Sequence, residues 1–119
     1  MSDTGQTILC ASSAYEEKYY LNPAFDSLPE SIKEELKIMC VLYTAEVGGI
    51  LTLAFEEDGE LYLHVSSDEG DLLYDDIGSV LKIKEIQQEK QELLESLELY
   101  YRAFFMEEDV QNILHDLEQ

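Results

Sequence analysis

The chain has 119 residues, 45% of them hydrophobic, and its 27 acidic residues against 7 basic ones give a formal net charge of −20. Length and hydrophobic content are typical of one folded domain rather than a disordered chain. The charge repels phosphate backbones and anionic lipid headgroups, so we expect neither nucleic-acid binding nor membrane docking. A basic protein would be attracted instead. The plain alternative is an acidic surface that is only solvated.

The start of the chain, MSDTGQTILC, lacks the basic residues and long apolar run of a secretory signal. The longest apolar run covers residues 38–45 and is too short to span a bilayer. Cys10 and Cys40 stand alone without a CxxC pattern, so we expect reduced thiols and no zinc site. These features predict a cytoplasmic protein with a single domain over residues 1–119, of which residues 1–6 are disordered.

The first elements are short. Residues 8–11 are expected to form a strand. The four-residue spacing of Tyr15 and Tyr19 favours a short helix over residues 12–21, which Asn22 and Pro23 would end.

A longer helix is predicted over residues 28–47. Ser27 and Glu30 have the spacing of a capping box at its start. From Ile38 onward the sequence is apolar on every side, which predicts that protein surrounds this half of the helix. Gly48 and Gly49 follow, where a helix commonly ends in a left-handed residue. A phosphate-binding loop would need further glycines or a Lys-Ser/Thr pair before a helix, so we interpret the glycine pair as a helix stop.

Residues 50–65 are predicted to form a β-hairpin. A two-residue turn at Asp58 and Gly59 would place the apolar residues of the two strands on opposite faces. A three-residue loop over residues 57–59 instead places them all on one face, with Gly59 at a left-handed bulge position. The predicted pairs are Phe55 with Leu61, Leu53 with Leu63, and Leu51 with Val65.

A long helix is expected over residues 72–106, with Asp71 as its N-cap. Apolar residues recur at spacings of three and four, and we expect them to form one buried seam. Gly78 is expected to kink or delay its start. One of two aromatic pairs, Tyr100 with Phe104 or Tyr101 with Phe105, should fill the core. Residues 107–119 suggest a separate short helix. The seam consists of Leu73, Ile77, Val80, Ile83, Ile86, Lys90, Leu93, Leu97, Tyr100 and Phe104.

The candidate binding residues are acidic. Between Ile38 and Leu81 there is no Lys or Arg, whereas ten acidic residues occur. Tyr62, on the polar face of the hairpin, is a candidate anchor. The predicted partner-binding residues are Glu56, Glu57, Asp58, Glu60, Tyr62, Asp68, Glu69 and Asp71.

No catalytic arrangement is apparent. The candidate calcium ligands do not follow the order of an EF-hand loop, so we expect no metal site; they are Asp68, Asp71, Asp75 and Asp76. His64 and His115 have no second ligand nearby and are interpreted as surface histidines. We therefore expect a non-enzyme without a cofactor.

Three segments carry a family resemblance: AYEEKYYLNPAF at residues 14–25, IMCVLYTAEVGGILTL at residues 38–53 and ESLELYYRAFF at residues 95–105. With them the chain resembles a family of short acidic bacterial proteins classed as a domain of unknown function. The resemblance covers nearly the whole chain and implies a bacterial cytoplasmic setting. It implies no catalytic residue, cofactor or partner.

Together these patterns predict a two-layer α+β fold, with helices on one face of a small antiparallel sheet built around the hairpin. Because an isolated hairpin is marginal, either residues 7–11 add a third strand or hairpins of two subunits pair edge to edge. We expect a non-enzymatic adaptor, inhibitor or immunity-like protein that binds a basic protein. The alternatives are a small-ligand binder or small enzyme with a pocket between the long helix and the sheet, or a structural homodimer.

Overall fold

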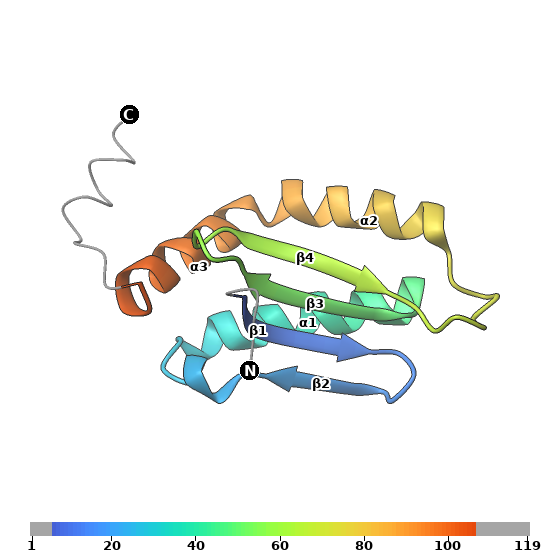
Figure 1. The fold of residues 1–119 in the computed structure, drawn as a ribbon, viewed down its shortest axis with the longest axis horizontal. Coiled ribbons are helices and arrows are strands. Elements are labelled where there is room, and N and C mark those ends of the chain that lie inside the picture. The colour runs from blue at the N-terminus through green and yellow to red at the C-terminus, as the bar shows by residue number, and fades with distance from the viewer. Residues whose placement is uncertain (1–5, 107–119) are drawn as a thin grey trace.

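The computed structural model describes residues 6–106 and confirms a two-layer α+β fold (Figure 1). An antiparallel four-stranded sheet has the strand order β2-β1-β3-β4, and α1 lies across one of its faces. The predicted helix over residues 107–119 and His115 lie outside the described residues. In chain order the elements are β1 (Thr7–Ser13), β2 (Lys18–Leu21), the 3-10 helix η1 (Pro23–Phe25), α1 (Glu30–Val47), β3 (Ile50–Phe55), β4 (Leu61–Ser66), α2 (Asp76–Glu89) and α3 (Gln91–Phe104).

The predicted helix over residues 12–21 is wrong, because the strand at residues 8–11 continues to Ser13 and turns back into β2. Ser12 pairs with Leu51 of β3 on one side and with Tyr19 of β2 on the other. Two strand neighbours satisfy the backbone of this segment, and this outweighs the helical spacing of its tyrosines. The strand therefore lies in the middle of the sheet, and β3 has no free edge for a second subunit.

A β-bulge in β1 places two consecutive side chains in the core. The pairing with β3 shifts between Ile8 and Cys10, which leaves Leu9 as the extra residue. Leu9 and Cys10 are both fully buried, although neighbours in a regular strand face opposite sides. The thiol of Cys10 lies 3.9 Å from that of Cys40 on α1, and both cysteines are free.

The two ends of α1 differ in how well the sequence predicts them. The capping box is wrong: Pro29 is the N-cap without a side-chain hydrogen bond, and the Ser27 hydroxyl lies 2.5 Å from the Tyr100 hydroxyl. The glycine stop is confirmed, since Gly48 and Gly49 have φ values of 89° and 71°. The Gly48 N–H donates to the Thr44 carbonyl and closes the last turn.

The second half of α1 is not surrounded by protein, contrary to the prediction. Its inner side, including Cys40 and Tyr43, is buried against the sheet. On its outer side Ile38 and Leu42 are 55% and 54% exposed. The outer side of α1 therefore faces solvent, although its sequence is as apolar as that of the inner side.

The predicted hairpin register is confirmed. Phe55 pairs with Leu61, Leu53 with Leu63 and Leu51 with Val65. Gly59 has a φ of 89°, its N–H donates to the Glu56 carbonyl, and the Glu56 N–H donates to the Glu60 carbonyl. This is the expected turn with a glycine bulge.

The single helix predicted over residues 72–106 is wrong. The helix begins at Asp76, with Asp75 as the N-cap, and it breaks at Lys90 into α2 and α3. The Asp75 carboxylate accepts a hydrogen bond from the Gly78 N–H and caps α2, whereas Asp71 accepts the Leu73 N–H in the preceding loop. The break lets α2 lie along α1, where Lys82 pairs with Glu46, while α3 reaches the hairpin.

Aromatic rings from distant parts of the chain fill the core at the end of α3. Tyr101 stacks on Phe55 with ring centroids 4.2 Å apart, and Phe25 stacks on Phe105 at 4.6 Å. The second pair lies further out, and Phe104 is 71% exposed. The prediction that one aromatic pair fills the core holds only for Tyr101, which is 7% exposed, because its partner Phe105 stacks on Phe25 and Tyr101 but remains 37% exposed.

Candidate functional site

The structure separates the predicted binding residues into two groups at opposite ends of β4 (Figure 1). The tip cluster, at the β3–β4 turn, consists of Glu56, Glu57, Asp58 and Glu60, with Tyr62 nearby on β4. The loop cluster follows the strand and consists of Asp68, Glu69 and Asp71. At about 3.4 Å per residue, β4 holds the two clusters roughly 20 Å apart.

The tip cluster is organised by hydrogen bonds within the hairpin. The Asp58 carboxylate accepts from the Glu60 N–H at 2.9 Å, and Glu56 accepts from the Gln6 side-chain amide. The His64 imidazole lies 3.8 Å from the Glu56 carboxylate. The nearby negative charge of Glu60 is the main cause that raises the pKa of Tyr62, so the exposed ring keeps its phenol proton.

Glu98 of α3 adds an acidic group beside the tip cluster that sequence reasoning missed. Its carboxylate accepts a hydrogen bond of 2.7 Å from the Leu61 N–H on the outer edge of β4. Burial is the largest cause raising the pKa of Glu98, and the charge of Glu60 adds to it. Only the break at Lys90, which turns α3 toward the hairpin, brings Glu98 to this position.

The loop cluster is fixed by Tyr15 from the β1–β2 turn. The Tyr15 hydroxyl donates to Asp71 at 2.5 Å and accepts from the Asp68 N–H at 2.9 Å. The hydrogen bond to Asp71 is the main cause that raises the pKa of Tyr15. This anchor joins residues 56 positions apart, so the local sequence contains no signal for it.

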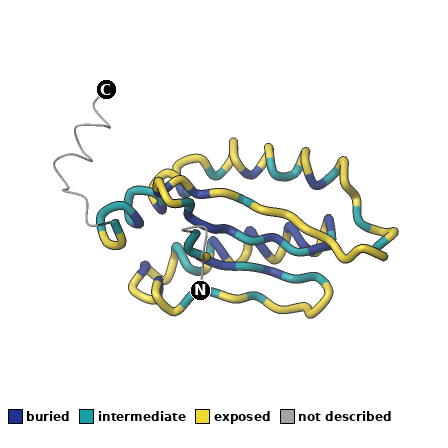
Figure 2. Tube along the Cα trace, viewed as in Figure 1, coloured by how far each residue is buried: buried dark blue, intermediate teal, exposed yellow. Residues whose placement is uncertain are grey.

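Aliphatic side chains beside the loop cluster face solvent. We call them the α2 aliphatic surface. They occupy the end of the loop and the outer side of α2, where Figure 2 shows exposed residues. The sequence pattern misplaced three of them, Leu73, Ile77 and Val80, in the buried seam. The exposed fractions are 95% for Leu72, 93% for Leu73, 76% for Ile77, 55% for Val80 and 63% for Leu81.

The acids around this surface have no cationic partner within residues 6–106. Lys82 pairs with Glu46 and Glu85, and Lys90 pairs with Glu35. No ion pair among the described residues involves Asp68, Glu69, Asp71, Asp75 or Asp76. The loop and the first turn of α2 therefore combine uncompensated negative charge with exposed apolar area.

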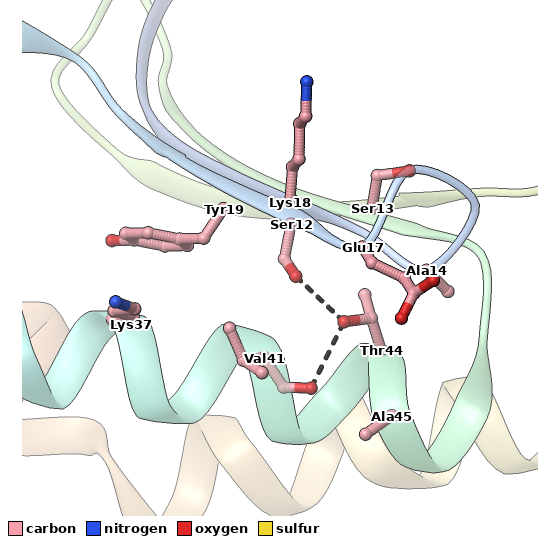
Figure 3. A pocket seen from close by; sticks show the side chains of 10 residues that line it. All are labelled: Ser12, Ser13, Ala14, Glu17, Lys18, Tyr19, Lys37, Val41, Thr44 and Ala45. Carbon is pink, nitrogen blue, oxygen red and sulfur yellow. Dashed lines mark hydrogen bonds between the residues drawn. The ribbon is translucent and has the colours of Figure 1, made fainter.

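A groove of about 790 Å³ lies between the β1–β2 hairpin and α1 (Figure 3). On its floor the Ser12 and Thr44 hydroxyls are 2.8 Å apart, and both residues are buried. Glu17 points toward the Thr44 end, while the Lys18 ammonium points away from α1. The groove differs from the expected pocket, which was placed between the long helix and the sheet.

Within the described part of the chain, no three His, Cys, Asp or Glu side chains gather in a way that could hold a metal ion. None of the helices in residues 6–106 is long and apolar enough to cross a membrane.

Fold and surface define a small two-layer α+β protein whose most accessible chemical features are acids and aliphatic side chains. The chain belongs to a family of unknown function, DUF6145, whose model matches residues 6–109. The expectation of an uncharacterised family is thereby confirmed. No curated protein and no solved structure matches the chain.

Proposed function

We propose that this protein is a non-enzymatic interaction protein of the bacterial cytoplasm, an adaptor or an inhibitor such as an immunity protein, that binds a basic protein. The observation that carries the proposal is the pairing of uncompensated acids with exposed leucines. Asp68, Glu69 and Asp71 stand directly before Leu72 and Leu73, which are 95% and 93% exposed.

Exposed acids alone are explained by solvation and carry little weight. Several highly exposed aliphatic side chains close together in the sequence are different, because soluble proteins expose large apolar patches mainly where they bind a partner. In protein complexes, charge accelerates the encounter of partners, and burial of apolar and aromatic groups supplies most of the affinity. The loop end of the hairpin offers both kinds of group.

The tip cluster offers a weaker version of the same combination. Its acids would add to the attraction of a basic partner. Its proposed anchor is a single side chain, Tyr62, which is 42% exposed. The two clusters lie too far apart for one small contact. The loop cluster is therefore the first candidate for the contact itself, and the tip cluster contributes steering.

The test is a pull-down from native lysate with the purified protein, washed at low and at raised salt. We expect a stoichiometric basic protein that raised salt releases, because screening weakens attraction between exposed charges. If the pull-down captures no other protein and the protein self-associates in a way that raised salt does not dissociate, the structural homodimer is favoured instead.

Two matched charge reversals distinguish the clusters. Asp68→Lys with Glu69→Lys should weaken binding of the captured protein by about tenfold or more. Glu57→Lys with Glu60→Lys changes the charge equally at the tip, and we expect a smaller loss that is confined mainly to the association rate. Unchanged affinity in both double variants would refute the proposal, provided that circular dichroism shows both to be folded.

A second candidate function is binding of a small molecule in the groove between α1 and the β1–β2 hairpin. The observation that favours it is the mixed lining, in which hydroxyls of Ser12 and Thr44 lie between Lys37 and Glu17. Native mass spectrometry of protein purified from cells tests it. A retained small molecule that an Ala45→Trp substitution excludes would support this function, and a bare protein mass would not.

A further inference from the structure

The two sides of α2 have different environments. Ser79, Ile83 and Ile86 face inward, and Ser79 and Ile86 are almost fully buried. At 3.6 residues per turn, Ile77 and Leu81 lie on the opposite side, with Val80 on the flank. This outer side and the preceding Leu72 and Leu73 form the α2 aliphatic surface.

The surroundings of this surface indicate the charge of its partner. Five acids that form no ion pair within the described part of the chain lie at its beginning, namely Asp68, Glu69, Asp71, Asp75 and Asp76. The exposed aliphatic patch on α1, formed by Ile38 and Leu42, is bordered instead by both signs, with Glu34, Glu35, Lys37 and Lys90. The α2 aliphatic surface differs in that its acids gather at its beginning, while the exposed Lys84 lies on the same side of α2 toward the other end, so a cationic group of a partner is favoured at the beginning of the surface.

We infer that the α2 aliphatic surface is the docking site of an amphipathic helix that carries Lys or Arg at its carboxyl end. The inference rests on the proposed function and specifies the partner that it requires. The helical part of the surface, from Ile77 to Leu81, covers about one turn of α2, and Leu72 and Leu73 add apolar side chains in the preceding loop. Apolar residues at i, i+3 and i+4 of a partner helix match the helical part.

The direction of the partner helix follows from electrostatics. Cations are favoured at the carboxyl end of a helix, where the helix dipole is negative. A helix antiparallel to α2 places this end beside the acids before α2. The same arrangement opposes the two helix dipoles, which is the favourable orientation.

A second copy of this chain is the less favourable occupant. It would bring a further net charge of −20 to the surface, and its own α2 begins with the same acids. Like charges in contact cost free energy, whereas a basic helix removes the repulsion that the acids already experience.

The test uses a synthetic 14-residue Leu/Lys peptide with helical apolar spacing and lysines toward its carboxyl end, and a scrambled peptide of the same composition. Binding to the full chain is measured by fluorescence anisotropy. The variant Leu73→Ser/Ile77→Ser/Leu81→Ser should bind the patterned peptide about tenfold or more weakly, because it loses apolar contact area. The control Ile38→Ser/Leu42→Ser, which removes two exposed aliphatic side chains from α1, should retain wild-type affinity.

Equal loss in both variants, or equal binding of the scrambled peptide, would overturn the inference. Sedimentation of the chain alone adds another decisive result: a dimer that the α2 serine variant converts to a monomer would assign the surface to a second copy. Because the substituted side chains are exposed, thermal unfolding should show that both variants are folded.

The failures of the two proposals differ. If charge reversal at Asp68 and Glu69 weakens peptide binding while the serine variant does not, the basic partner stands and the docking site is wrong. If the serine variant abolishes binding while charge reversal and salt have no effect, the docking site stands and the proposed preference for a basic partner is wrong.

Discussion

At the scale of single residues, three glycines hold backbone conformations that other residues rarely adopt. Gly48 and Gly49 end α1, and Gly59 closes the β3–β4 turn, all with positive φ. A Cβ at Gly59 would lie 2.9 Å from the Met106 Sδ and 3.0 Å from the Arg102 Cγ. Gly59 therefore meets a conformational and a steric requirement at the same position.

Replacing Gly59 by Val should lower the free energy of unfolding by about 1–3 kcal/mol, because valine resists the left-handed conformation and meets neighbouring side chains. Urea denaturation measures the loss. Gly70→Val is the control, since a Cβ at Gly70 would meet nothing within 4 Å. A Gly59→Val protein as stable as the control would contradict the role of this turn.

The conformation of these glycines can be predicted from the sequence because its determinants are local. The register of the hairpin follows from the alternation of Leu53 and Phe55 and from one glycine in the turn. The hydrogen bonds of Tyr15 to the loop cluster are equally specific, but they join residues more than 50 positions apart. No local pattern distinguishes such a tyrosine from one in a helix.

At the scale of elements, α1 connects the sheet to the other helices, and one buried polar contact fixes its position on β1. The Ser12 and Thr44 hydroxyls lie 2.8 Å apart, and Thr44 also contacts the Cys40 and Val41 carbonyls. Buried hydroxyls need such partners, because an unpaired one loses its hydrogen bonds to water without replacement.

Thr44→Val should destabilise the protein by about 1–3 kcal/mol, because it leaves the buried Ser12 hydroxyl without its partner. Adding Ser12→Ala should recover part of this loss, since the orphaned group is then removed. Thermal and urea unfolding of both single variants and the double variant complete the cycle. Thr52→Val, at a half-buried strand position, serves as the control, and strictly additive losses would contradict the coupling.

The errors at this scale have physical causes. Apolar residues at helical spacing predicted one buried helix from residue 72, but Leu73 and Ile77 face solvent and the helix begins at Asp76. Periodicity indicates which residues share a side of a helix and does not indicate whether protein covers that side. Likewise, the strand pairs on both sides of Ser12 overrode a helical pattern that was only local.

At the scale of the whole molecule, the net charge of −20 works against compactness. Among the described residues, lysines pair with acids mainly between elements, as Lys82 does with Glu46 and Lys90 with Glu35. Far more acids than cations remain, so repulsion between carboxylates lowers the stability of the folded state.

Raising NaCl from about 0.02 M to about 0.5 M should therefore raise the melting temperature by roughly 5 °C, because salt screens repulsion between exposed charges. Circular dichroism measures the transition. KCl at the same ionic strength should have the same effect, which separates screening from specific ion binding. A melting temperature that stays constant or falls with salt would contradict this account.

The strand order β2-β1-β3-β4 has a consequence for self-association. Among the strands within residues 6–106 it leaves β2 and β4 at the edges, and edge strands are the usual starting points of sheet-to-sheet aggregation. β2 has just four residues and is followed by Asn22 and Pro23. β4 is bounded by Glu60 and Asp68, and Glu98 accepts its first outward N–H. A second chain could therefore pair with either a short edge or an edge flanked by negative charge, and we expect these acids to disfavour the growth of fibrils.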